Sequence, residues 1–217
     1  SFAVAICMVL SVCFVSVSVF ADNAELQGNA LPAFPGAEGG GKFTKGARGV
    51  LDSGEGKLEV YHVTNLNSEG PGSFTDAISQ SGRIVVFDVG GVIDVPSTVY
   101  INNDNITILG QTAPGDGITL TGGDLRIGNG VKNVIIRYMR VRPTNKNGQE
   151  VDGLGGQWNS DIIIDHCSTS WCVDEGLTLY AGSAESDTYE QGKRLTVQNT
   201  ITSESMRMSG HFKGAHG

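Results

Sequence analysis

One kind of segment occurs four times in this sequence: NITILG (residues 105–110), NVIIRYMRV (133–141), DIIIDHC (161–167) and RLTVQNT (194–200). Each is short and rich in β-branched residues, as strands are. The segments begin 28, 28 and 33 residues apart, and periods of about 20–50 residues indicate a repeating solenoid. Because no long amphipathic helix lies between them, the sequence predicts an all-β fold, a parallel β-helix.

Each coil of such a solenoid can bury its apolar face only by stacking on the next coil. Asparagines near the expected turns either stack into hydrogen-bonded ladders or serve as ordinary turn residues. The polar stretch 181–193 is expected to be a surface loop inserted into one coil. The ladder candidates are Asn105, Asn133, Asn159 and Asn199, and further strand-like runs lie at 57–65, 83–88, 118–120, 125–127 and 177–180.

One short helix is expected at residues 73–80 (SFTDAISQ). Ser73 is a suitable N-cap, and Asp76 occupies the capping-box position three residues later. The apolar residues of this segment, Phe74 and Ile78 among them, suit a helix that covers an open end of the sheets.

Residues 1–21 carry no charge and end in Val19-Phe20-Ala21, which fits a signal-peptidase site. We expect a secretory signal peptide, incomplete because an initiator Met and a basic n-region are absent. A membrane anchor is the alternative, because a span needs about 18 apolar residues. Residues 22–217 are expected to be the N-terminal part of a single domain, since Gly217 follows a strand without a capping element.

All charged residues follow residue 21, so the net charge of −8 belongs to the mature part. A negative net charge does not favour binding to nucleic acid, which is itself negatively charged. For the same reason, an acidic polysaccharide would need a metal ion between it and the protein. Only Cys167 and Cys172 remain after the signal peptide. Two small buried thiols are expected, with one local bridge as the alternative.

Two motif-like stretches are set aside. GAEGGGK (residues 36–42) lacks the Ser or Thr that a phosphate-binding loop requires, because Phe43 follows the lysine. Asp165 and His166 lie beside Ser168, as in a hydrolase triad, but neighbours on a strand point to opposite faces. Asp165 is therefore not expected to orient His166, and the pair is expected to have a structural role within the coil stack.

Two acidic pairs carry the chemical signal: Glu150 with Asp152, and Asp174 with Glu175. Glu150 and Asp152 alternate along the chain, so both can face one side of a strand. Asp174 follows Asp152 by 22 residues, close to one coil. Since neighbouring strands lie about 4.7–4.9 Å apart, these carboxylates can converge on one hard cation such as calcium. The alternative is that they are solvated turn residues.

The residues around these acids resemble the pectate lyases of polysaccharide lyase family 1. The family's Ile-Ile-Asp-His motif occurs at 163–166 and continues through CSTSW (167–171) to Asp174 and Glu175. The resemblance covers about residues 31–217. Further matching stretches are AFPGAEG (33–39), GPGS (70–73), VFDVGG (86–91) and GQTAPGDG (110–117).

The resemblance implies a right-handed parallel β-helix in a secreted, monomeric, calcium-dependent enzyme that cleaves pectate, a 4-linked galacturonan, by β-elimination. Lys213, in a His-x-Lys element, would contact a substrate carboxylate. The base of the family is an Arg expected beyond Gly217, so the fragment is expected to be inactive alone. The metal ligands that the resemblance implies are Glu150, Asp152, Asp174 and Glu175.

Two alternatives stay open. One is a non-catalytic β-helix protein that binds pectin. The other is a β-helix hydrolase, which would need a pair of acids at hydrolytic spacing and no metal. The chain also contains one N-glycosylation sequon, at Asn105, as expected of a glycoprotein. Glycosylation of Asn105 would be blocked if the start of its strand is buried.

Overall fold

The computed structural model describes residues 30–214 except 55, 147, 149, 181–191 and 210. The chain separates into two units, Ser1–Leu31 and Pro32–Gly217, and every helix and strand of the described part lies in the second. The expected signal peptide and most of the expected loop at 181–193 lie outside the described residues. None of the helices in the described part is long and apolar enough to cross a membrane.

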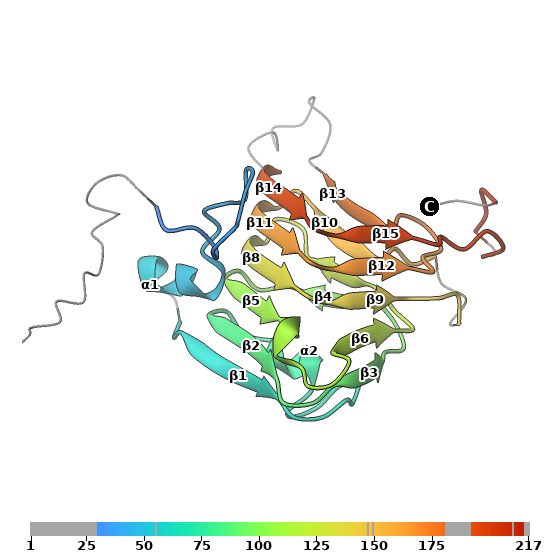
Figure 1. The fold of residues 1–217 in the computed structure, drawn as a ribbon, viewed down its shortest axis with the longest axis horizontal. Coiled ribbons are helices and arrows are strands. Elements are labelled where there is room, and N and C mark those ends of the chain that lie inside the picture. The colour runs from blue at the N-terminus through green and yellow to red at the C-terminus, as the bar shows by residue number, and fades with distance from the viewer. Residues whose placement is uncertain are drawn as a thin grey trace, which may run out of the picture. The chain divides into compact units, whose positions relative to one another are not determined.

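Three parallel sheets form the second unit, and the chain passes through them in turn (Figure 1). From β2 onward, successive strands go to sheets A, B and C in cyclic order. Neighbouring strands within each sheet therefore come from adjacent coils. The prediction of a parallel β-helix is confirmed.

The strands are short, as the sequence segments indicate. Sheet A contains β1 (Glu59–Val63), β2 (Arg83–Phe87), β5 (Ile106–Leu109), β8 (Lys132–Arg137), β11 (Ser160–Asp165) and β14 (Lys193–Gln198). Sheet B contains β3 (Gly91–Asp94), β6 (Ile118–Thr121), β9 (Arg140–Arg142), β12 (Ser168–Ser170) and β15 (Ile201–Ser203). Sheet C contains β4 (Val99–Ile101), β7 (Leu125–Ile127), β10 (Leu154–Gln157) and β13 (Leu177–Tyr180).

The helices of the described part are short. The helix expected at residues 73–80 is α2 (Phe74–Ala77), and it ends earlier than expected. The Ser73 hydroxyl accepts the N–H of Asp76 at 3.2 Å, as an N-cap does. The Asp76 carboxylate accepts the N–H of Gly72 (3.1 Å), so the capping box is not reciprocal. The others are η1 (Gly46–Gly49), α1 (Val50–Ser53) and η2 (Gly110–Thr112).

Bends between the strands recur at residues with left-handed backbone conformation. One series lies at the start of the sheet A strands β5, β8, β11 and β14. It explains the period of the sequence, because its members are spaced as the four segments are. Left-handed φ is accessible mainly to Gly, Asn and Asp, which accounts for the asparagines at several of these bends. The series is Asn105, Asn133, Asp161 and Arg194, with φ of 60°, 57°, 57° and 58°.

The expected asparagine ladder forms only in part. The amide of Asn133 donates to Asn105 (3.1 Å), and the amide of Asn105 donates to the hydroxyl of Ser81 (3.4 Å). Asn159 instead donates to backbone carbonyls, and Asn199 donates to a carboxylate. Asn105 is only 8% exposed, so the amide of the sequon is buried within the coil stack.

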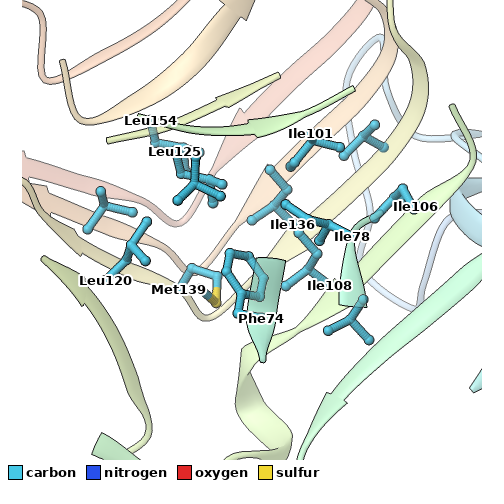
Figure 2. Packing of buried hydrophobic residues seen from close by; sticks show 14 of the residues in the cluster. Phe74, Ile78, Ile101, Ile106, Ile108, Leu120, Leu125, Ile136, Met139 and Leu154 are labelled. Carbon is cyan, nitrogen blue, oxygen red and sulfur yellow. The ribbon is translucent and has the colours of Figure 1, made fainter. Parts of the chain in front are cut away.

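The core lies between the three sheets and is built from columns of aliphatic residues (Figure 2). In sheet A, Ile108 pairs with Ile136, and Ile136 pairs with Ile164 on the next coil. All three are fully buried. At the first coils, Phe74 of α2 is buried and its ring stacks on Phe87 with centroids 5.8 Å apart, so α2 covers the core as expected.

The outer face of sheet A is covered by the segment before η1. Ile135 and Ile163 point outward and pack against Phe34 and Ala37 of this segment. The N–H of Gly41 donates to the Thr196 hydroxyl of β14 at 2.8 Å. Residues 36–42, the glycine-rich stretch that superficially matches a phosphate-binding loop, therefore help to cover the outer face of sheet A.

Asp165 is a fully buried carboxylate that joins three coils. It accepts from the guanidinium of Arg137 (2.7 Å), the amide of Gln198 (2.9 Å) and the amide of Asn199 (3.1 Å). Burial alone would raise the pKa of Asp165, but hydrogen bonds, including one from His166, outweigh it and hold the pKa below its usual range. The side chain therefore acts as an ionised cross-link between coils.

The expectation that Asp165 would not orient His166 is wrong. His166 Nδ1 lies 2.8 Å from the Asp165 carboxylate. His166 has a φ of 52°, and this left-handed residue ends the alternation of side chains along β11. The imidazole then stacks on Tyr138 of the previous coil, with ring centroids 4.7 Å apart.

Both described cysteines are free and buried. Cys167 is 3% exposed and Cys172 is 1% exposed. Burial raises the pKa of Cys167 to about 11 and that of Cys172 to about 12. The two thiols are therefore protonated and unreactive at neutral pH.

Replacing the buried carboxylate should weaken the fold. We expect Asp165→Asn to lower the free energy of unfolding by about 3 kcal/mol, because Arg137 then lacks its anionic partner in a buried setting. The folded-state pKa of Asp165 is depressed, so its contribution exists above the unfolded pKa of about 3.9 and is lost as pH falls through the folded value. Urea titrations at pH 7 and below pH 4 measure both effects.

The matched control is Asp94→Asn, whose exposed carboxylate pairs with the exposed Lys146. This change should cost less than about 1 kcal/mol. Equal losses for the two variants at pH 7 would contradict the cross-linking role of Asp165.

Candidate metal centre

The two acidic pairs are brought together by the stacking of β13 on β10. Leu154 pairs with Leu177 in these parallel strands, so Asp152 and Glu175 occupy equivalent positions two residues earlier. The N–H of Gly153 donates to the carbonyl of Glu175 at 2.9 Å. A side chain at Gly153 would meet the Gly176 carbonyl at 2.1 Å, so glycine permits the close approach of the two turns.

Three of the four predicted ligands converge. Oxygen atoms of Asp152, Asp174 and Glu175 all lie within 4.8 Å of one another. Calcium takes oxygen ligands at about 2.3–2.6 Å, so one cation between these carboxylates fits the set. Asp152 and Asp174 are partly buried and Glu175 is exposed.

Glu150 faces a different partner. Its Oε1 accepts the N–H of Phe212 at 3.1 Å, and its Oε2 lies 3.6 Å from Nε2 of His211. Both carboxylate oxygens are thus directed at the turn that contains His211. Glu150 stands beside the acidic cluster and is not one of the three converging residues.

The turn around His211 closes one side of the cluster. The His211 side chain is 1% exposed, and its Nε2 lies 3.5 Å from the Asp174 carboxylate. The N–H of Lys213 donates to His211 Nδ1 at 3.1 Å, so the proton of the ring is on Nε2, facing the carboxylates. Lys213 itself is exposed, with its ammonium 5.4 Å from the ring centroid of Phe212.

Sequence reasoning missed two residues of this site, Asp124 and Arg126. Arg126, on β7, donates from Nη2 to Asp152 at 2.6 Å and from Nε to Asp124 at 2.7 Å. Asp124 is completely buried. The spacing could have indicated Asp124, because it precedes Asp152 by 28 residues, which is one period of the repeat.

Negative charge at this site exceeds what Arg126 balances. Burial raises the pKa of Asp152 to about 7, and the nearby carboxylates of Glu175 and Asp124 add to this, while Arg126 opposes it. Ionised carboxylates that repel one another in a partly buried site favour a bound cation. The donor set, all oxygen, suits calcium or magnesium rather than zinc or copper.

A cavity of about 350 Å³ opens beside Asp152 on the outer face of sheet C. Arg126 and Asp152 lie at its wall, together with Gly128 and Gly156. Two tyrosines and several polar amides line the rest of the wall. They are Tyr100, Tyr180, Asn102, Asn129 and Gln157.

Asp165 and His166 lie elsewhere. His166 borders a separate cavity of about 500 Å³, together with Tyr138, Arg140 and Asn199. In the described residues neither Asp165 nor His166 contacts the acidic cluster. Their place in the structure is the cross-link between coils.

No family model matches the chain. Its sequence is similar to proteins named "Probable pectate lyase C": 40% identical over 178 residues in Aspergillus flavus, 42% over 177 in Emericella nidulans and 41% over 178 in Aspergillus terreus. Each match covers 82% of this chain, which spans 38% of the length of these relatives.

Among solved structures, the fold is similar to Jun a 1, the major allergen from cedar pollen. The TM-score is 0.58 at 17% sequence identity, over 89% of this chain and 63% of that one. This likeness supports the parallel β-helix. Over most of its length, the chain is a homologue of the fungal proteins named pectate lyase C.

Proposed function

We propose that this chain is part of a secreted pectate lyase that cleaves the 4-linked galacturonan of pectin by calcium-assisted β-elimination. The observation that carries the proposal is the convergence of Asp152, Asp174 and Glu175 beside an open cavity in a homologue of proteins named pectate lyase C. Because the chain spans 38% of those relatives, the activity belongs to the longer protein, which we expect to act as a monomer.

The proposed roles follow from charge. Pectate is a polyanion and this protein is acidic, so a cation between them is required. Calcium, held by Asp152, Asp174 and Glu175, would neutralise a uronate carboxylate and stabilise the negative charge that develops when the adjacent C5 proton is removed. Lys213 supplies a further cation at the rim, where its backbone is fixed by His211. Glu150 holds that turn in place.

The base is proposed to lie outside this chain. Arg126 is the one arginine among the described residues that line the cavity. It is paired with two carboxylates, which keeps a guanidinium protonated, so it cannot accept the C5 proton. The resemblance to pectate lyases implies an arginine base, which we expect beyond Gly217, and hence no cleavage by this chain alone. The same observation favours the second candidate function, a protein that binds pectin without cleaving it.

Activity tests the first candidate against the others. The full-length protein, given polygalacturonate and calcium, should release unsaturated products that absorb in the ultraviolet, and chelation of calcium should abolish them. Reducing ends without unsaturation would identify a hydrolase. Binding of polygalacturonate without either product would identify the non-catalytic protein.

Calcium binding tests the ligand set directly. Asp152→Asn should weaken calcium binding by at least about tenfold, because it removes one of three converging carboxylates and its charge. Glu150→Gln should change the affinity by less than about threefold, because its oxygens face the Phe212 N–H and His211. Isothermal titration measures both. A larger loss for Glu150→Gln than for Asp152→Asn would overturn this assignment.

A further inference from the structure

Arg126 connects two coils at the edge of the acidic cluster. From β7, its Nε binds Asp124 of the same coil and its Nη2 binds Asp152 of the next coil. The side chain is 30% exposed and forms part of the cavity wall. One guanidinium thus touches a buried carboxylate, a proposed metal ligand and the open space of the cavity.

The two carboxylates hold Arg126 differently. Asp124 is completely buried, and its Oδ1 has no hydrogen-bond partner among the described residues. A buried carboxylate without its cation is strongly disfavoured, so Asp124 keeps Arg126 at all times. Asp152 is 20% exposed and lies in the group that can hold a cation. The Asp152 carboxylate is therefore shared between Arg126, which binds its Oδ2, and the group that can hold a cation.

We propose that Arg126 exchanges partners: it binds Asp152 in the metal-free protein and a uronate carboxylate of the polymer once a cation has taken Asp152. The inference rests on the proposed function and deepens it. When a cation takes the Asp152 oxygen, Nη2 loses its acceptor while Nε stays on Asp124. The free edge of the guanidinium then faces the cavity, where a carboxylate is its best complement.

The exchange makes metal and polymer cooperative. A cation must displace Arg126 before it binds, and the displaced guanidinium regains a hydrogen-bonded anion only when the polymer is present. Each ligand therefore strengthens the other by the same factor, as linkage requires. We expect digalacturonate to raise the calcium affinity by about tenfold, a value within the usual range of such coupling.

The experiment measures calcium binding by isothermal titration with and without saturating digalacturonate, using the full-length protein. The double variant Asp124→Asn with Arg126→Gln replaces the ion pair by two amides and leaves the net charge unchanged. We expect it to bind calcium about three- to tenfold more tightly than wild type without sugar. We also expect its coupling to be smaller than in wild type, with only the part that calcium itself supplies by bridging protein and polymer. The matched control, Asp161→Asn with Arg194→Gln, removes a similar ion pair from sheet A and should keep the coupling.

Coupling of wild-type size in the folded double variant would overturn the exchange, and so would its absence from the wild type. Should the double variant lack the near-ultraviolet circular dichroism of a folded protein, Arg126→Lys decides. A lysine carries its donors on one nitrogen and lacks the separate Nε and Nη2 with which Arg126 can keep Asp124 while it changes its other partner. Coupling must therefore fall, and undiminished coupling overturns the proposal. Absence of calcium binding or of unsaturated product in the wild type would overturn the proposed function instead.

Discussion

The hydrogen-bonded register between successive coils is the constraint on which the rest of this structure depends. Because parallel strands pair in register, residues one period apart become direct neighbours, as Ile108, Ile136 and Ile164 do. The register that forms the core columns also brings the turn of Asp152 against that of Glu175. The acidic residues of these two turns are thereby brought together by strand pairing alone, without a separate helix or loop to position them.

Stacking like residues has opposite consequences for apolar and for charged side chains. Each added coil buries more apolar surface in an aliphatic column, whereas stacked carboxylates repel one another. Asp165 avoids the penalty with donors from the coils on either side of its own. Asp152 does not: burial and the neighbouring carboxylates raise its pKa to about 7, although Arg126 opposes them. Asp165 is thus a structural carboxylate, whereas Asp152 lies where a further cation would be stabilising.

Sequence reasoning succeeded where the period alone determines structure. It located the strands of the repeat, the N-cap of α2 and the proximity of Asp152 to Asp174 and Glu175. It failed where one residue leaves the regular pattern. Strand alternation did not foresee the left-handed bend that turns His166 toward Asp165. Arg126 escaped notice because its role depends on side-chain reach across coils. Glu150 was expected among the ligands because its actual partners lie about 60 residues away in the sequence.

The segment that covers sheet A has a consequence for the order of folding. Contacts between coils join residues about one period apart, so closing each loop costs little entropy and coils can add one after another. The contact of Gly41 with Thr196 spans 155 residues. It requires β14, the last strand of sheet A in the described part, and therefore forms late. Residues 34–41 thus reach their final position only after β14 has formed, and proteolysis before that moment would find this stretch unprotected.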